Sequence, residues 1–584
     1  MRGRANWRVV EWALIAASAV LSLVFVWRAS AVLDGHRTFT LFDDAMISMR
    51  YGRNLVDGHG LVFNSGQSVE GYTNLFWTLI MGGVQVVVPG RRLAPGAVSL
   101  VGLALFVGQL FVVRALTRRL TDVEWAPALA IAGTAFSFAL VFWTLRGMEV
   151  GLLGLLLSAA VLLAARALDE GVDTRAVVLI AGLLVLAFFT RDDAAVPCVV
   201  IITFLVIGVE RGRRRAAVMW AVGSAVVVVA GRLLLRWVLY GHLVPNTYVL
   251  KVEGIPKHLL VERGLLGLGY VLGFGLAVPI ALAVLAYDRT DVRPVRLAVM
   301  MLATIVVAQI AYSVVVGGDA WEDAGFANRF LATVAAPLSI LAAIGVAKLA
   351  RGRVSRRAGL LALTPIVAAG VFALAAPRFT RYFQLGDESP EAGTHHAIRI
   401  LFLALAAAAL VGAVWWRAAR PLVVAVLALA AIGAPNALPF AQWVRHNQPF
   451  EATEAAWARY GERLNSATQP DATIAASSIG NIGYFSQRPI VDELGKIDET
   501  IARSPARTSF WVLPGHWRWD YHYSIVTLRP DVVAELFGPT RADESMIAAS
   551  GYELVPSPSG PVYVRADSTL VDRTGLRRAA QVAR

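Results

Sequence analysis

The chain has 584 residues, of which 57% are hydrophobic and 16% are charged. A soluble globular protein carries about 25% charged residues, and the mean hydropathy here is +0.60, so a soluble fold is excluded. The formal net charge of +13 could suggest nucleic-acid binding, but the basic residues cluster in short loops between long apolar runs. Such loops set membrane topology by facing the cytoplasm. The composition therefore predicts an all-α polytopic membrane protein with no nucleic-acid partner.

The first apolar run extends from about Trp12 to Trp27 and follows the basic start MRGRANWR. No convincing small-residue cleavage site follows it, so we expect a retained anchor rather than a signal peptide. With the basic start inside, this helix runs outward and places Asp43 and Asp44 on the outer side. The single cysteine, Cys198, lies in an apolar run, which excludes a disulfide framework and a cysteine metal site.

The next apolar segment, residues 72–89, has two interpretations. If it crosses the membrane, the basic cluster at 114–120 falls outside and the later basic loops are inverted. If it lies along the outer interface, every strong basic loop faces the cytoplasm, and we favour this arrangement. It gives about thirteen spanning helices, near residues 9–28, 96–114, 125–143, 150–167, 176–190, 194–210, 216–239, 266–286, 296–316, 330–349, 358–376, 400–416 and 421–441.

The character of the chain changes after Gln442. Residues 442–584 contain polar helical stretches such as EATEAAWARYGERLNS, short apolar runs such as YSIVTL, and turn signals such as GNIG. This alternation predicts a small α/β domain outside the membrane. We therefore divide the chain into a membrane module, residues 1–441, whose first outer loop is 29–95, and an extracytoplasmic domain, residues 442–584.

Asp43 and Asp44 begin a short predicted helix that ends near Gly58, and their charges suit its amino end. An arbitrary aspartate at this place is more often a helix cap. Two consecutive acids in the first outer loop favour a catalytic function instead. Such a pair can deprotonate an acceptor hydroxyl, or it can hold a divalent cation such as Mg, Mn or Ca against a phosphate.

Four further outer loops supply polar groups, at residues 145–149, 190–193, 240–254 and 314–330. A lone loop cation is usually a solvated anchor. Several cations around one outer face, opposite an acidic pair, fit an anionic lipid phosphate better. The candidate phosphate-binding residues are Lys251, Arg191, Arg329 and His242.

At this point a family resemblance is visible. The segments FDDAMISMRYGRNLVDGHGLVFN, VEGYTNLFW, YGHLVPNTYVLK and VGGDAW, followed by NRFL, resemble those of C-type (GT-C) glycosyltransferases. Within that class the chain is most similar to the actinobacterial arabinofuranosyltransferase group, which includes the mycobacterial terminal enzyme. NIGYFSQRPIVDELGKIDETIAR and PGHWRWD also resemble the outer domain of such proteins. The alanine- and arginine-rich composition is consistent with an actinobacterial source.

The resemblance implies a GT-C membrane fold with juxtamembrane helices, and Asp43 and Asp44 as the catalytic acids. It implies a polyprenyl-phosphate sugar donor, such as decaprenyl-phosphoryl arabinofuranose. The acceptor would be a cell-envelope glycan, such as arabinogalactan or lipoarabinomannan, on the outer face of the cytoplasmic membrane. VGGD is separated from Arg329 by more residues than the family pattern leads us to expect, so the role of Arg329 is open.

The remaining candidate residues would bind the sugar or the acceptor. In the membrane module they are Glu70, Tyr72, Asn74, Glu149, Asn246, Thr247 and Asp319, and in the outer domain they are His516, Trp517 and Trp519. Two rival functions stay open. One is a mannosyltransferase of the same fold that acts on protein or lipid. The other is a transporter or flippase of envelope lipids, which should place its ionisable residues near the bilayer midplane.

Overall fold

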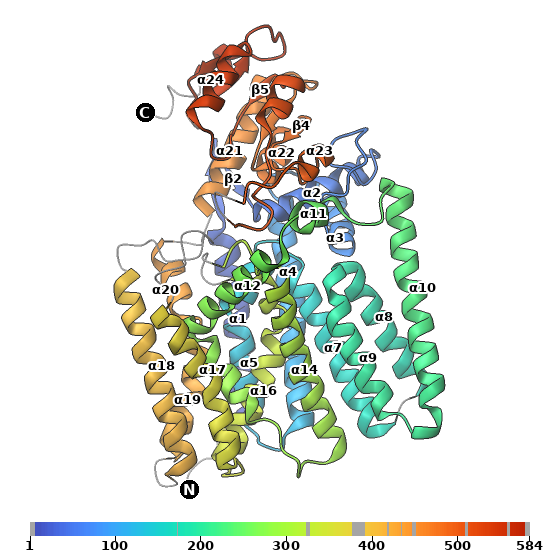
Figure 1. Ribbon diagram of the computed structural model, residues 1–584, viewed down its shortest axis with the longest axis vertical. Helices are drawn as coiled ribbons and strands as arrows, with labels where there is room; N and C mark the ends of the chain where they lie inside the picture. The colour runs from blue at the N-terminus through green and yellow to red at the C-terminus, as the bar shows by residue number, and fades with distance from the viewer. Residues whose placement is uncertain are drawn as a thin grey trace.

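The computed structural model describes residues 6–171, 173–322, 327–375, 392–416, 420–433, 435–446, 451–508, 512–557 and 561–578. Figure 1 shows a tall bundle of helices with a smaller α/β domain on its upper end. The N-terminus lies at the lower end of the bundle, and the C-terminus lies beside the upper domain. The predicted spans 358–376 and 421–441 and the predicted domain 442–584 run partly over residues outside this description.

Apolar helices make up the bundle. Their bounds are α1 (Trp7–Arg28), α4 (Ala94–Leu120), α5 (Ala126–Ala135), α6 (Phe138–Leu145), α7 (Val150–Glu170), α8 (Thr174–Thr190), α9 (Ala195–Gly208), α10 (Arg214–Tyr240), α12 (Lys257–Val271), α13 (Ala277–Val284), α14 (Arg293–Val315), α16 (Ala335–Ala350), α17 (Arg356–Ala375), α18 (Ala392–Trp415), α19 (Arg420–Gly433) and α20 (Ala437–His446). Short turns, η1 (Asp192–Ala194) and η2 (Arg211–Arg213), join α8, α9 and α10.

Among the described residues, six helices are long and apolar enough to cross a membrane, or eight if each of two bent pairs forms one span. The chain is a multi-pass membrane protein. The larger number of about thirteen spans, which also counts shorter apolar helices, stays a prediction.

Each predicted span falls on helical residues, but several spans are interrupted. The span at 125–143 is divided into α5 and α6, which are bent by 51°. The span at 266–286 joins α12 to α13 through a π-helical turn, η3 (Leu272–Leu276), in which Gly275 has a φ of 112°. Glycine adopts this backbone conformation without the penalty that a Cβ would bring. Apolar composition predicts a span but carries no information about a break inside it.

The helices α2 (Asp43–Val56) and α3 (Leu75–Val87) lie across the upper end of the bundle (Figure 1). At 13 residues, α3 is about 20 Å long, which is shorter than the ~30 Å hydrocarbon core. Its length agrees with an interfacial placement of residues 72–89. The two helices approach closely where both carry glycine, because a Cβ on Gly52 would lie 2.9 Å from the Gly82 nitrogen. The short helix α11 (Asn246–Val252) is also on the upper side of the bundle (Figure 1). The short helix α15 (Arg329–Ala332) lies next to α2, because Arg329 pairs with Asp44.

A five-stranded sheet forms the centre of the upper domain. Its order is β4-β3-β5-β7-β6, in which β3 pairs parallel with β4 and β5, and β7 pairs antiparallel with β5 and β6. The elements of this domain are α21 (Glu451–Ala467), β3 (Ile474–Ala476), α22 (Ile479–Ser486), β4 (Ile490–Asp492), α23 (Glu499–Arg503), η5 (His522–Thr527), β5 (Val532–Val533), α24 (Arg541–Ala549), β6 (Tyr552–Val555), β7 (Val562–Arg565) and α25 (Arg573–Arg578). A separate hairpin of β1 (Ser30–Leu33) and β2 (His36–Phe39) follows α1. The helix α20 runs across the predicted domain boundary between residues 441 and 442.

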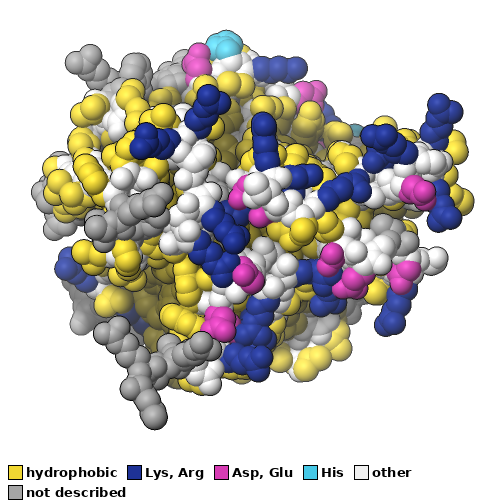
Figure 2. Space-filling model, turned by 90° about the horizontal axis from the view of Figure 1, so that it is seen from below, with side chains coloured by type: hydrophobic (Ala, Val, Ile, Leu, Met, Phe, Trp, Pro, Cys, Tyr) yellow, Lys and Arg dark blue, Asp and Glu magenta, His cyan; other side chains and the backbone are white. Residues whose placement is uncertain are grey.

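The basic loops gather at the lower end of the bundle, where Figure 2 shows many Lys and Arg side chains. Loops after α4, before α14 and after α16 meet there around one hollow. The acid pair at the start of α2 lies at the opposite end of the bundle (Figure 1). This separation is what the predicted topology requires, with basic loops on one side of the membrane and the acids on the other.

Buried polar contacts hold the upper domain on the bundle. Arg50 of α2 donates to the carbonyl oxygens of Gly483 and Arg488, at 2.5 and 2.7 Å. Arg146, which follows α6, forms an ion pair with Glu454 of α21, and both side chains are fully buried. Because an unpaired buried charge is costly, each member of this pair depends on the other.

Replacing Glu454 by alanine leaves the buried Arg146 guanidinium without its counter-ion. We expect this change to cost about 3 kcal/mol or more and to lower the Tm of the purified protein in detergent. The matched control is Glu462→Ala on the same helix, because Glu462 pairs with Arg92 at 2.7 Å with both side chains partly exposed. Such a pair contributes about 0–1 kcal/mol. Equal losses of Tm in the two variants would contradict the importance of the buried pair.

Candidate active site

Asp43, the first residue of α2, faces the upper domain. Its carboxylate accepts hydrogen bonds from the backbone N–H groups of Asn481, at 2.7 Å, and Gly480, at 3.2 Å. Burial raises the pKa of Asp43 to about 6, although the Lys496 ammonium and these N–H groups oppose the rise. A carboxyl group with this pKa can take up and release a proton close to neutral pH.

Asp44, the next residue, lies between two cations. Its carboxylate accepts hydrogen bonds from Lys496 Nζ, at 2.6 Å, and from the Arg329 guanidinium, at 2.9 Å. Burial raises the pKa of Asp44, but the charges of Lys496, Arg329 and Lys251 outweigh burial and hold this pKa far below its ordinary value. Asp44 is therefore a constant anion that connects α2 with the start of α15 and with the upper domain.

Both aspartates are largely buried rather than exposed on the outer surface. Asp43 is 9% exposed, and the Asp44 side chain is 17% exposed. The upper domain covers them, and it supplies two partners that the sequence analysis missed, Lys496 and Asn481. The segment that contains these residues resembles an outer domain of the GT-C class. The resemblance identified the segment but did not show which of its residues contact the acids. Lys496 and Asn481 could not be paired with the acids from the sequence, because they lie more than 430 positions further along the chain.

A cavity of about 370 Å³ lies beside the acid pair, under the upper domain. Five cations line it, from the residue after α8 and from α10, α11 and α15, against three acids. Its other side is apolar and includes side chains of α8, α10 and α14. The charged lining residues are Arg191, Arg232, Arg236, Lys251, Arg329, Asp192, Asp193 and Asp319, and the main apolar ones are Phe188, Val229, Leu233, Leu243, Val244, Tyr248, Tyr312 and Phe330.

Neither member of the acid pair is among the residues that line this cavity. Arg329 connects Asp44 to the cavity, because it lines the cavity and its guanidinium binds Asp44. The same guanidinium binds Asp319 at 3.0 Å. The ring of Trp143 lies under the same guanidinium, at 5.1 Å from the ring centre. Three contacts therefore hold Arg329 between the acids and the cavity.

Lys251 differs from the other cations of the cavity. Within the described chain its ammonium has no ion-pair or hydrogen-bond partner, whereas the four arginines are paired with carboxylates. Burial and the nearby Arg329 charge lower the pKa of Lys251 to about 8, although the Asp44 carboxylate opposes this. An unpaired, half-buried ammonium is a strong binding group for an anion.

Arg232 and Arg236, one turn apart on α10, were not among the predicted site residues. Both donate to Glu70, at 3.2 and 2.5 Å, and Arg236 also donates to Asp192 at 2.8 Å. Glu70 was predicted to bind the sugar or the acceptor. The structure buries it at 2% exposure and uses it to hold these two arginines at the cavity.

Several other predicted sugar or acceptor ligands form hydrogen bonds within the protein. The Tyr72 hydroxyl lies 2.9 Å from that of Tyr240. Asn74 donates to Glu149 at 2.8 Å, and Glu149 in turn accepts from Arg191 at 2.6 Å. These residues therefore support the wall of the cavity from behind.

Of three further residues that were predicted to bind the sugar or the acceptor, two line the cavity and one does not. Thr247 and Asp319 line the cavity. Asn246 does not, because its side-chain amide donates to the backbone carbonyls of Gly495 and Lys496, at 2.9 and 3.1 Å. This contact orients the loop that carries the Lys496 side chain toward Asp44.

The predicted phosphate ligand His242 lies outside the cavity and pairs with Glu499 at the surface, at 3.0 Å. The predicted acceptor residues of the outer domain are buried rather than exposed. Trp517 is 0% exposed, Trp519 is 5% exposed and His516 is 8% exposed. The Trp517 indole donates to a backbone carbonyl of α11. A glycan cannot stack on rings that lie inside the protein. Trp517 instead packs against Ile255 and Leu260 and joins the upper domain to the bundle, whereas Trp519 packs in the core of the upper domain.

The acid pair was also predicted as a possible site for a divalent cation. Among the described residues, no group of three His, Cys, Asp or Glu side chains is placed to hold a metal ion. Both oxygens of Asp44 already meet cations, and those of Asp43 meet N–H donors. This donor arrangement does not fit Mg, Mn or Ca, and metal binding stays an untested prediction.

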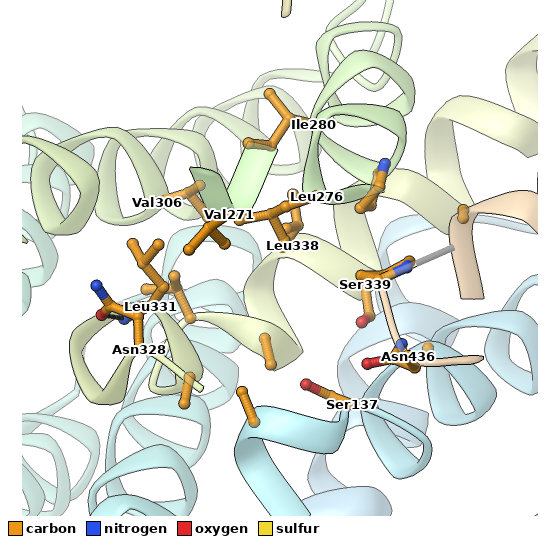
Figure 3. Close-up of a pocket in the computed structure, with 18 of the residues that line it drawn as sticks. Ser137, Val271, Leu276, Ile280, Val306, Asn328, Leu331, Leu338, Ser339 and Asn436 are labelled. Atoms are coloured by element: carbon orange, nitrogen blue, oxygen red, sulfur yellow. Dashed lines mark hydrogen bonds between the residues drawn. The ribbon is translucent and has the colours of Figure 1, made fainter. Parts of the chain in front are cut away.

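A second cavity, of about 80 Å³, lies lower in the bundle between α5, α13, α14 and α16 (Figure 3). Its wall is mainly apolar, as Val271 and Leu338 illustrate. The amides of Asn328 and Asn436 reach it, but both donate hydrogen bonds within the protein. None of its lining residues is titratable. This cavity therefore offers no catalytic group.

Residues 442–577 match a family described as "Domain of unknown function (DUF8728)". Over 298 residues the chain is 30% identical to the "Terminal beta-(1->2)-arabinofuranosyltransferase" of Mycobacterium tuberculosis, covering 47% of this chain and 43% of that protein. The chain thus spans less than half the length of this curated relative.

Two crystal structures of ArnT from Cupriavidus metallidurans superpose on nearly the whole chain. The apo form has a TM-score of 0.53 at 14% identity, covering 94% of this chain and 97% of that one. The form "bound to Undecaprenyl phosphate" has a TM-score of 0.55 at 13% identity, covering 97% and 99%. The chain has the GT-C fold. The resemblance that the sequence motifs indicated is confirmed, both in the fold and in the likeness to a mycobacterial terminal arabinofuranosyltransferase.

Gly480 is the position at which the upper domain approaches the acid pair most closely, since a Cβ there would lie 1.9 Å from the Asp43 carbonyl oxygen. We expect Gly480→Ala to push α22 away from α2 at a cost of about 1–3 kcal/mol. The measurement is the Tm together with amide hydrogen exchange across α2, which should increase. The control is Gly83→Ala in α3, where a Cβ would meet nothing within 4 Å. Unchanged exchange at α2 in Gly480→Ala would refute this close contact.

Proposed function

We propose that this protein is a glycosyltransferase that moves a sugar from a polyprenyl-phosphate donor to a cell-envelope glycan on the outer face of the cytoplasmic membrane. The observation that carries this proposal is the cavity beside the acid pair, where the unpartnered Lys251 ammonium lies near Arg329, which in turn binds Asp44. The GT-C fold and the arabinofuranosyltransferase relative support it. The same relative favours arabinofuranose as the sugar.

The donor phosphate would bind among the cations of the cavity. Lys251, Arg191 and Arg329 approach it from three different elements, so a phosphate can contact each of them. As the bond between the sugar anomeric carbon and the phosphate oxygen breaks, negative charge builds on the leaving phosphate. Fixed cations in a buried cavity stabilise that charge without reorganising. The apolar side of the cavity would take the first isoprene units of the donor.

The acceptor hydroxyl would be activated by Asp43. Its carboxylate has about four lone-pair positions. The backbone N–H groups of Gly480 and Asn481 and the side-chain amide of Asn481 occupy three of them, which leaves one for the acceptor hydroxyl. A raised pKa makes Asp43 a better base than Asp44, which is neutralised by two cations. The hydroxyl oxygen attacks the anomeric carbon while its proton passes to Asp43. Asp44 keeps Arg329 in position for the phosphate.

The base can be tested with Asp43→Asn and synthetic polyprenyl-phosphate donors that carry arabinofuranose or mannose. We expect transfer to fall about 100-fold to 10,000-fold, while donor binding is retained. The matched control is Asp57→Asn, because Asp57 lies at the other end of α2 and is 46% exposed at its side chain. If Asp43→Asn transferred sugar at the wild-type rate, Asp43 would not be the base. Transfer of mannose but never of arabinofuranose would refute the proposal that the transferred sugar is arabinofuranose.

The pH dependence of kcat/KM should be bell-shaped. Activity should rise as the pH increases through about 6, because the base Asp43 must lose its proton, and it should fall as the pH increases through about 8, because Lys251 loses its charge. Lys251→Arg keeps the cation at all these pH values and should remove the upper limb alone. The control Lys257→Gln changes an exposed lysine of α12 and should leave both limbs in place. An unchanged upper limb in Lys251→Arg would exclude Lys251 as its origin.

A further inference from the structure

Arg263 is a buried arginine in the second turn of α12 that the proposed reaction does not use. It is 0% exposed, and it does not line the cavity beside the acid pair. Its guanidinium donates to the backbone carbonyls of Val512, at 3.0 Å, Asp319, at 2.8 Å, and Gly317, and to the Glu322 carboxylate at 3.3 Å. These acceptors belong to the upper domain and to the loop after α14. Because a guanidinium carries five N–H donors in a rigid plane, this one side chain fixes the two segments relative to each other.

Two glycines allow the loop after α14 to approach this arginine closely. Gly317 and Gly318 have φ values of 88° and 72°, in the left-handed region that favours glycine. A Cβ on Gly318 would lie 2.6 Å from Glu322 Oε1 and 3.1 Å from Arg263 Nη1. The glycines of the VGGD segment therefore make room for a buried ion pair between α12 and the loop.

The first connection from Arg263 leads to Arg329. The Asp319 carboxylate accepts from the backbone N–H of Arg329 at 2.8 Å and from its guanidinium at 3.0 Å through each oxygen. The Glu322 carboxylate accepts from the side-chain amide of Asn328 at 2.6 Å, and Asn328 is the N-cap residue of α15. Asp319 and Glu322 both bind Arg263 as well, so the backbone and the side chain of Arg329 are held in position relative to α12.

The second connection leads to Lys251 through the upper domain. The carbonyl of this domain that accepts from Arg263 belongs to residues 512–517, which contact α11. Pro514 of this segment lines the cavity. A Cβ on Gly515 would lie 3.1 Å from Lys251 Cε, and the indole of the same segment donates to a backbone carbonyl of α11 at 2.8 Å. The stem of Lys251 therefore lies against a segment that Arg263 holds in place.

Lys251 and Arg329 are two of the cations that would bind the donor phosphate. Cations stabilise a leaving phosphate best when they are already in place before the bond breaks, and small misplacements are costly. We propose that Arg263 is a positioning residue for sugar transfer, which fixes Lys251 and Arg329 relative to each other from outside the cavity. This role rests on the proposed function, because Arg263 acts only through the cations that bind the donor phosphate.

The proposal can be tested with Arg263→Lys, which keeps a charge beside Glu322 but lacks the planar fork that reaches both segments. The measurement is the affinity of the full chain in lipid nanodiscs for decaprenyl phosphate. We expect this affinity to fall about tenfold, and the KM for a polyprenyl-phosphate sugar to rise by a similar factor. In a Lys251→Gln background the same change should cost only about threefold, because one of the two positioned cations is already absent. Equal losses in both backgrounds would overturn the proposal.

The matched control is Arg488→Lys. Arg488 is also buried, and its guanidinium donates to oxygens of Thr468 and Asn465 within the upper domain. This variant should have a lower Tm but should keep the affinity for decaprenyl phosphate within about twofold. An equal loss of affinity in Arg488→Lys and Arg263→Lys would show a general loosening of the upper domain and would overturn the positioning role.

A second variant, Gly515→Ala, tests the connection to Lys251 and leaves the buried arginine in place. It should lower the affinity about threefold in the wild type and not at all in Lys251→Gln. An unchanged affinity in the wild-type background would overturn the proposal even if Arg263→Lys does not fold. If the wild type itself neither binds decaprenyl phosphate nor transfers sugar, the proposed function is wrong, and the positioning role falls with it. If the wild type does both and Arg263→Lys matches it, only the positioning role is wrong.

Discussion

The structure depends on the ion pairs of Asp44, whose carboxylate is shared by Lys496 of the upper domain and Arg329 at the start of α15. A carboxylate that is moved out of water loses much hydration free energy, and only close opposite charges replace it. Here two cations do so, from segments 285 and 452 positions away. The acid pair, the arginine of the cavity and the upper domain are thus one electrostatic unit. The proposed active site exists only when the upper domain is docked on α2.

The docking of the upper domain also gives the neighbouring acids Asp43 and Asp44 pKa values that shift in opposite directions. Successive residues of a helix point about 100° apart, so Asp43 faces the backbone of α22 while Asp44 faces the cations. Burial then raises the pKa of Asp43, and the cations lower that of Asp44. Paired acids whose pKa values move in opposite directions are typical of sites that need one proton carrier and one fixed charge. The proposed division between a base and an orienting anion follows from this difference.

Local sequence patterns predicted the features that depend on residues close together in the chain. Long apolar runs predicted the membrane helices, and two adjacent acids after the first run drew attention to the region of the candidate site. The partners of these acids were missed, because the pairing of Lys496 with Asp44 depends on how distant segments fold together. The burial of Trp517 and the pairing of Glu70 with Arg232 and Arg236 were missed for the same reason. Composition shows that such residues are polar or aromatic, but not whether they face a ligand or the interior.

The helix α10 relates the site to the membrane. Only 6% of the residues in its most apolar stretch are buried within the protein, so the apolar side chains of this stretch are available to lipid. Its buried residues are Arg232, Arg236 and Tyr240, all near its upper end, where the two arginines meet Glu70. Val229 and Leu233 of the same helix line the cavity on its apolar side. One wall of the cavity is therefore a helix whose upper end is held by ion pairs at the cavity. The lower part of this helix can contact the hydrocarbon of the bilayer. A donor whose phosphate binds the cations can keep its prenyl chain in the bilayer beside α10, so the lipid need not leave the membrane for its sugar to reach the acids.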